Sequence, residues 1–146
     1  MKISSGVFFI AAWVLSGSAL AQADHIAIFK NVSGPMKVVR TDANLDAVNG
    51  MELRTSDKVV AGEGASGGIV FKDGTLLTVG ASTEISIRDY AFEPRDSKYA
   101  FSVYLAKGTA IYSSGKIGKL SPDSVHVDTP KASVGVRGTR FIVTAE

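Results

Sequence analysis

The sequence predicts a single all-β domain, built either as a short coiled β-solenoid or as a two-sheet sandwich. From Ile26 onward, apolar residues mostly alternate, and Gly, Asp, Asn or Ser interrupts them about every ten residues, as expected of short strands joined by turns. No segment shows a convincing helical period. In the clearest hairpin, residues 69–71 and 76–79 flank Asp73-Gly74, a pair that accepts the backbone angles of a two-residue turn. Both architectures use such strands and turns, so the choice between them stays open.

The other expected strands are short apolar segments in which residues two apart share one face. In chain order they contain Ile26 and Ile28, Met36 and Val38, Val59 and Val60, Ile85 and Ile87, and Phe101, Val103 and Leu105. Gly-Thr corners at Gly74, Gly108 and Gly138 each precede a β-rich run, where glycine supplies the unusual backbone angle. Three such corners are too few to define a true repeat.

Residues 1–21 have the features of a cleavable secretory leader. Lys2 provides a positive start, residues 7–15 form an apolar run, and Ala19-Leu20-Ala21 fits a small-x-small cleavage site. The apolar run is shorter than the roughly 18 residues of a membrane-spanning helix. We therefore expect a mature domain of residues 22–146, without stable membrane insertion, in the periplasm or secreted.

Composition argues against several classes of function. The chain has no cysteine, which excludes disulfides and thiolate metal sites. Its 16 basic and 14 acidic residues are intermixed, without the basic patch that a nucleic-acid partner requires. Of the two histidines, only His126 is a plausible general base, and no serine lies in a Gly-x-Ser-x-Gly elbow. We expect no enzyme activity and no cofactor.

Two interpretations of His126 and Asp128 are open, and the more specific one is a metal site. Both residues share one face of a predicted strand, with Asp123 in the preceding turn. The simpler interpretation is a solvated strand face, because no second histidine is at hand to complete a zinc-like ligand set. The glycine-rich stretch at residues 62–68 lacks the Lys-Ser/Thr ending of a phosphate loop. We therefore predict neither a metal nor a phosphate site.

Residues 88–98 depart from the strand pattern, because charged residues surround aromatic ones and Pro94. We expect an exposed excursion there, which is either a solvated loop or a partner-binding surface, since Tyr and Arg are favoured interface anchors. The candidate contact residues are Tyr90, Phe92, Arg95 and Tyr99.

Arg137 lies between glycines near the end of the chain. A buried guanidinium with five donors can tie the carbonyls of neighbouring turns together, whereas an exposed one can bind a carboxylate of a partner. We favour the structural clasp, which predicts a lower thermal midpoint for Arg137→Ala.

From residue 47 to the end, the chain resembles the FecR domain family. The resemblance rests on ordered pieces: Gly50-Met51-Glu52-Leu53, then residues 69–75, 105–108, 127–130 and 134–141. The residues that carry it and that we expect to have structural roles are Asp73, Gly74, Gly108, Thr129, Pro130, Arg137, Gly138, Thr139 and Phe141.

The best-known FecR members pass a signal from outer-membrane receptors to the cell interior, through a transmembrane helix that precedes their periplasmic domain. Here a leader occupies that place and the chain stops after the last signature strand, so we expect a stand-alone version. The resemblance implies an accessory domain that binds another envelope protein, with oligomeric state left open. The alternative is an envelope glycan or small-ligand module that uses Tyr90, Tyr99, Tyr104 or Tyr112 as stacking platforms.

Overall fold

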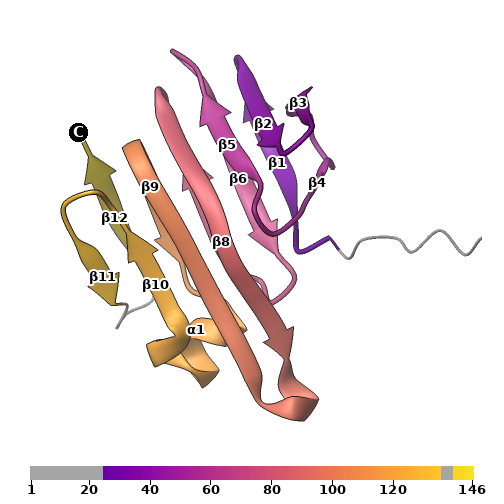
Figure 1. Ribbon diagram of the computed structural model, residues 1–146, viewed down its shortest axis with the longest axis vertical. Coiled ribbons are helices and arrows are strands. Elements are labelled where there is room, and N and C mark those ends of the chain that lie inside the picture. Colours follow the sequence, from indigo (N-terminus) through magenta and orange to yellow (C-terminus); the bar gives the residue numbers. More distant parts are fainter. Residues whose placement is uncertain (1–24, 136–139) are drawn as a thin grey trace, which may run out of the picture.

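The computed structural model describes residues 25–135 and 140–146, and within them twelve strands form one curled open sheet (Figure 1). The strands before the long central hairpin are β1 (Ala27–Ser33), β2 (Met36–Arg40), β3 (Ala43–Asp46), β4 (Glu52–Leu53), β5 (Lys58–Ala61), β6 (Ser66–Phe71) and β7 (Leu76–Val79). They are followed by β8 (Thr83–Glu93), β9 (Lys98–Ser113), β10 (Val125–Asp128), β11 (Ser133–Gly135) and β12 (Arg140–Ala145). The helical elements are α1 (Lys116–Leu120) and the 3₁₀ turns Pro94–Asp96 and Pro122–Ser124.

The strand β9 belongs to both halves of the curled sheet. Its first part, up to Lys107, pairs with β8 on one side and, at residues 101–104, with β10 on the other. Its last part pairs with β7 and β12. The first half of the sheet therefore has the order β3-β2-β5-β8-β9-β10-β11, and the second half continues from β9 through β7, β6 and β1 to β4, with β12 on the other side of β9.

The change of direction within β9 occurs at Gly108, whose φ is +94°. The Thr83 hydroxyl accepts a hydrogen bond from the Thr109 amide at 3.0 Å, beside this glycine. Gly80 completes the corner by donating its amide to the Thr109 carbonyl at 3.0 Å. The predicted Gly-Thr corner at Gly108 is thus the point at which one strand passes from the first half of the sheet to the second.

The concave side of the curl holds one continuous hydrophobic core. Alternation places Val38, Val59, Ile85, Val103 and Leu105 in it from the first half, and Phe29, Leu53, Ile69, Leu77 and Tyr112 from the second. The all-β, single-domain prediction is confirmed. The arrangement is closer to the sandwich than to the solenoid because two halves enclose a core, but β9 joins those halves into one sheet.

Three local features differ from expectation. The hairpin at Asp73-Gly74 has a three-residue loop, because Gly74 donates to the Phe71 carbonyl and alone has a positive φ, of +87°. Residues 88–98 are mostly strand, and the 3₁₀ turn Pro94–Asp96 connects β8 to β9 at the tip of the hairpin. A one-turn helix, α1, covers the crossover that allows β10 to run parallel to β9.

Candidate partner-binding site

The outer end of the β8–β9 hairpin extends past the neighbouring strand β5. β5 pairs with β8 only as far as Ser86, whereas the hairpin continues to the Glu93–Lys98 pair. In Figure 1 this end of the hairpin projects from the lower edge of the molecule. The segment expected to be an exposed excursion is therefore a protruding strand pair.

The four candidate contact residues lie on this hairpin but in different environments. Phe92 and Tyr99 are directly opposite each other, with ring centroids 6.2 Å apart, and both are half-buried. Arg95 is exposed in the 3₁₀ turn at the tip. Tyr90, Phe92 and Tyr99 all pack against the hydrophobic core, and the Tyr90 ring also stacks on Phe71, with the ring centroids 5.2 Å apart.

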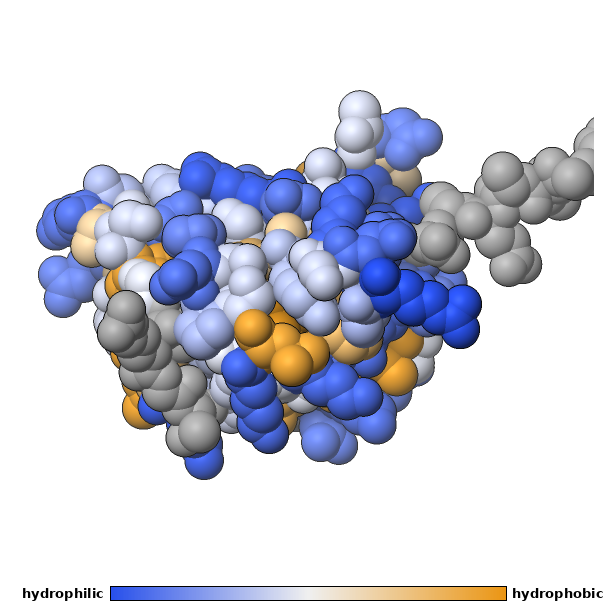
Figure 2. All heavy atoms as spheres, turned by 90° about the horizontal axis from the view of Figure 1, so that it is seen from below, coloured by the Kyte–Doolittle hydropathy of each residue, from blue (hydrophilic) through white to orange (hydrophobic). Residues whose placement is uncertain are grey.

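Figure 2 shows the end of the molecule that lies lowest in Figure 1. Hydrophilic side chains cover most of this end, and they surround a small central group of hydrophobic atoms. A contact at this end would therefore combine a few apolar anchors with a polar rim, which is the usual composition of a protein–protein interface.

Tyr90 fixes the base of the hairpin through Asp73. The Tyr90 hydroxyl donates to Asp73 Oδ1 at 2.9 Å and accepts from the Asp73 amide at 3.0 Å. Burial, together with the negative charge of Asp73, raises the pKa of Tyr90 well above its ordinary value of 10.0. Tyr90 is thus an anchor between β8 and the β6–β7 turn.

Asp73 is itself a buried hub, with only 2% of its surface exposed. Besides Tyr90, its carboxylate accepts from the Thr75 hydroxyl at 2.6 Å, the Thr75 amide at 3.3 Å and the Ile117 amide at 3.0 Å. The Asp73 carbonyl also accepts from the Lys116 amide at 2.9 Å. Because the first amides of a helix lack partners within the helix, this aspartate caps α1 from a distant turn.

Tyr112 lies beside this network and is 1% exposed. Its ring stacks on Phe141 at 4.9 Å, which gives the signature residue Phe141 a packing role against β9. In the described part of the chain the Tyr112 hydroxyl makes no hydrogen bond, and burial raises its pKa.

Glycan or ligand stacking needs open tyrosine faces, and the four tyrosines offer few. Tyr112 is buried and Tyr90 is packed on Phe71. The Arg88 guanidinium lies 4.1 Å from the centre of the Tyr104 ring and covers one face of it. Tyr99 is half-buried opposite Phe92. These contacts leave little open ring surface for ligand stacking on the four tyrosines.

The two histidines weighed as catalytic groups lie on different halves of the sheet, and His126 shares the strand β10 with Asp128. His126 is exposed on β10, and Asp128 pairs with Arg88 at 3.6 Å and with the Ser133 hydroxyl. His25 lies 3.5 Å from Glu52, on the other half of the sheet. Across residues 25–135 and 140–146, no three His, Cys, Asp or Glu side chains are grouped as metal ligands would be.

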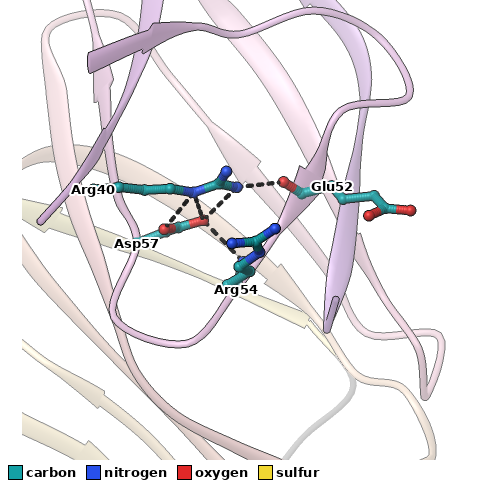
Figure 3. Close-up of polar contacts among 4 residues, drawn as sticks. All are labelled: Arg40, Glu52, Arg54 and Asp57. Carbon is teal, nitrogen blue, oxygen red and sulfur yellow. Dashed lines mark hydrogen bonds and ion pairs between the residues drawn. The ribbon is translucent and has the colours of Figure 1, made fainter. Parts of the chain in front are cut away.

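A buried arginine clasp is present at Arg40 and Asp57 (Figure 3). The Arg40 Nε donates to Asp57 Oδ1 at 3.0 Å, and its Nη2 donates to Asp57 Oδ2 at 3.1 Å and to the Glu52 carbonyl at 2.8 Å. Asp57 also accepts from the Arg54 amide at 2.8 Å. Sequence reasoning missed this pair, since nothing local links residues 17 positions apart.

Several signature residues hold turns. The Thr129 hydroxyl accepts from the Ala132 amide at 3.1 Å, and Thr129 and Pro130 form the β10–β11 turn. Asp73 and Gly74 shape the β6–β7 loop, and Gly108 shapes the bend in β9. The remaining signature positions, Arg137, Gly138 and Thr139, lie outside the described residues, as does the expected leader at residues 1–21.

Comparison with known protein families supports the resemblance seen in the sequence. The FecR protein family matches residues 57–146, which is more than half of the chain. The chain belongs to the FecR family. No curated protein and no solved structure matches it.

The FecR match begins at Asp57 and therefore includes the buried partner of Arg40, the Asp73 hub, the β8–β9 hairpin and the last strand. FecR membership indicates a signalling-related regulatory role, in a family that is not a known enzyme family. FecR domains are typically associated with the cell envelope. Among the residues that the structure describes, no helix has the length and hydrophobicity needed to cross a membrane.

Proposed function

We propose that this FecR domain is a non-enzymatic accessory domain of the bacterial periplasm that binds another envelope protein through the outer part of its β8–β9 hairpin. The observation that carries the proposal is the protrusion of this hairpin, with Arg95 at its tip and the Phe92–Tyr99 pair beside it. Aromatic residues and arginine are the side chains that most often contribute large binding free energies at protein interfaces.

The anchoring of the hairpin supports the same assignment. The Tyr90 hydroxyl joins β8 to Asp73, and the Tyr90 ring packs against both Phe71 and Phe101, which also contact each other. A surface that is ordered before binding loses less conformational entropy when a partner docks. The hairpin can therefore present Phe92, Arg95 and Tyr99 in a fixed arrangement.

The proposed compartment rests on two observations. The first 21 residues have the pattern of a secretory leader, and the chain belongs to a family that is typically envelope-associated. The absence of cysteine also means that the domain needs no disulfide formation in that compartment.

The test is site-specific photo-crosslinking in the cell envelope. A photoreactive residue at Glu93, which is exposed beside Arg95 and leaves the proposed contact residues in place, should capture one dominant envelope protein, identified by mass spectrometry. The matched control carries the same group at Asp46, whose side chain is 85% exposed on β3, and should not capture that protein. The double substitution Phe92→Ala and Arg95→Glu should abolish capture by a probe placed at Glu93.

Both control measurements decide the interpretation. The double variant should remain cooperatively folded with a moderately lower thermal midpoint, because Phe92 packs against the core with a half-buried ring, whereas Arg95 is exposed. Equal capture of the same protein from Glu93 and Asp46, or undiminished capture by the double variant, would place the binding surface elsewhere and contradict the proposal.

A further inference from the structure

The last strand, β12, forms an edge of the second half of the sheet. It pairs with β9 over all six of its residues, from Arg140 opposite Ser113 to Ala145 opposite Gly108. On its other side, no strand pairs with it within residues 25–135 and 140–146. The other strands at ends of the sheet are shorter: β4 has two residues, β11 three and β3 four. β12 is therefore the longest of these edges.

Among the described residues, this edge shows two signs of openness to pairing with another chain, an unbroken register and an exposed central side chain. An edge strand exposes a row of backbone amides and carbonyls, and proteins commonly blunt it with proline, a bulge or inward-pointing charge. β12 contains no proline, and its register with β9 is unbroken. Ile142, at its centre, is 66% exposed. These features leave the free edge of β12 able to form backbone hydrogen bonds with a strand of another chain.

A groove runs beside the same strand. Its volume is about 500 Å³, and it lies between β12 and the β10–β11 hairpin. Its lining includes Phe141 and Val143 from β12 and Ala132 and Val134 from the hairpin. Ile142 and Thr144, which face away from the core, also line it, so the groove follows β12 over residues 141–144, where side chains of an added strand would lie.

The charges of β12 identify the strand that fits. Arg140 and Glu146 are both exposed and lie six residues apart, so they project from the same face as Ile142. If two copies of β12 pair antiparallel about a two-fold axis at Val143, each Arg140 lies opposite the Glu146 of the other copy. The same register places Ile142 opposite Thr144 and Phe141 opposite Ala145.

We propose that β12 pairs antiparallel with β12 of a second copy of this chain, centred on Val143, and forms a symmetric dimer. A two-fold interface is self-complementary, as this strand is. Opposite charges directly across a strand pair stabilise it, and like charges in that position destabilise it. The core-facing side chains of each added strand enter the groove of the other copy.

Other registers fit less well. A two-fold axis perpendicular to the sheet keeps the core-facing side chains of both copies on the same face of the sheet. Because side chains alternate between the two faces along a strand, this requires that one residue lies directly opposite its own counterpart at the axis. Centring the pair on Ile142 places Arg140 opposite Thr144 and leaves the two charges without each other. Val143 is thus the centre that pairs both charges and uses the whole strand.

The contact is expected to be weak. A single strand pair buries less than the roughly 1,600 Å² of an ordinary stable interface. We therefore expect a dissociation constant in the micromolar range, with monomers in dilute solution and dimers as the concentration rises.

Sedimentation velocity of the mature protein across the micromolar range tests the dimer and its register. Arg140→Glu places like charges opposite each other twice and should weaken the dimer about tenfold, as should Glu146→Arg. The combined charge swap should restore the parental dissociation constant. Lys37→Glu, an equal change of charge on β2, should leave it unchanged, because Lys37 is 64% exposed and remote from the edge.

Cysteine pairing provides an independent test, since the chain has no cysteine of its own. A mixture of Ile142→Cys and Thr144→Cys proteins should form a disulfide between unlike chains under mild oxidation. Residues opposite each other in antiparallel strands have Cα atoms about 4.5–5.5 Å apart, within disulfide range. Ile142→Cys alone should form far less dimer, because Ile142 is not opposite itself.

Three outcomes would overturn the proposal: a protein that stays monomeric at all concentrations, a dimer indifferent to Arg140→Glu, or disulfide formation that is equal in the mixed and single-variant samples. Neither test involves the β8–β9 hairpin. Failure of the dimer proposal therefore does not count against partner binding by the β8–β9 hairpin. Failure of the hairpin proposal likewise does not count against the β12 dimer.

Discussion

At the scale of single residues, Asp73 and Tyr90 connect three parts of the molecule. The Asp73 carboxylate accepts from Thr75, Tyr90 and the first turn of α1, while 98% of the residue is removed from solvent. A buried carboxylate is tolerated only when donors surround it, and each lost donor leaves a polar group without compensation. The hairpin base, the β6–β7 turn and α1 therefore depend on one side chain.

This arrangement predicts loss of stability at alkaline pH. Folding raises the pKa of Tyr90 above its ordinary value of 10.0, because burial and Asp73 disfavour the phenolate. The stabilisation is fully present below pH 10 and is lost as pH rises toward the folded-state pKa, since the unfolded chain then releases a proton that the native state retains.

Thermal midpoints of the parent and Tyr90→Phe, measured between pH 9 and pH 11, check this prediction. The parent should lose stability more steeply with pH than the variant, although the variant starts from a lower midpoint because Asp73 has lost a donor. Lysine titration contributes equally to both proteins and cancels in the comparison. Parallel curves would show that Tyr90 does not carry the pH dependence.

At the scale of elements, the bend in β9 depends on Gly108. A Cβ added there would lie 2.5 Å from Thr83 Cα and 2.7 Å from Thr83 Cβ, and the φ of +94° is strained for any other residue. We expect Gly108→Ala to destabilise the domain by about 2–4 kcal/mol, through steric overlap and backbone strain.

Urea unfolding measures this difference, with Gly135→Ala as the matched control. A Cβ added at Gly135, on β11, meets no heavy atom of the described residues within 4 Å, so that variant should stay within about 0.5 kcal/mol of the parent. Equal midpoints for the two variants would mean that the β9 bend tolerates a side chain.

The elements also show what the sequence can predict. Alternation located the β6–β7 hairpin and the cores of β8 and β9, because burial of one strand face has a period of two. Turn chemistry identified Gly74 and Gly108 as corners, since both need a positive φ. Membership of the FecR family was predicted from the ordered pieces and confirmed.

The features that were missed depend on contacts between distant residues. Nothing near Asp73 indicates that its carboxylate reaches Ile117, 44 positions away. The parallel pairing of β10 with β9 likewise depends on α1, which is too short to produce a helical period. The mix of charged and aromatic residues in segment 88–98 suggested an exposed loop, because the charges interrupt the alternation. In the structure, Tyr90 and Phe92 lie opposite Phe101 and Tyr99 in strand register.

At the scale of the whole molecule, the clasp of Arg40 and Asp57 joins the two halves of the sheet. Arg40 ends β2 in the first half, and its guanidinium also donates to the carbonyl of Glu52 in β4, which belongs to the second. The clasp therefore restrains the curl on the side of the molecule away from β12. Sequence reasoning assigned such a role to Arg137, for which it remains a prediction.

Removing one partner should cost more than removing both. Arg40→Leu leaves Asp57 buried without its counter-charge, and we expect about 3–5 kcal/mol of destabilisation. The double variant Arg40→Leu and Asp57→Leu should recover part of that loss, because no buried charge remains. Arg40→Lys should be intermediate, since an ammonium cannot make the forked contact with the carboxylate.

Denaturant unfolding of the three variants gives the comparison. A double variant less stable than Arg40→Leu would show that Asp57 acts mainly through its bond with the Arg54 amide and not through the ion pair.

The passage of β9 through both halves of the sheet has a consequence for how the chain acquires its structure. β9 pairs with β7, β8, β10 and β12, so no strand joins the two halves of the sheet until residues 98–113 are present in the growing chain. Until then the earlier strands expose apolar faces that only the later chain covers. Contacts so distant in sequence form slowly. A newly made molecule is therefore expected to pass through a half-assembled stage, in which the apolar faces of its earlier strands are still open.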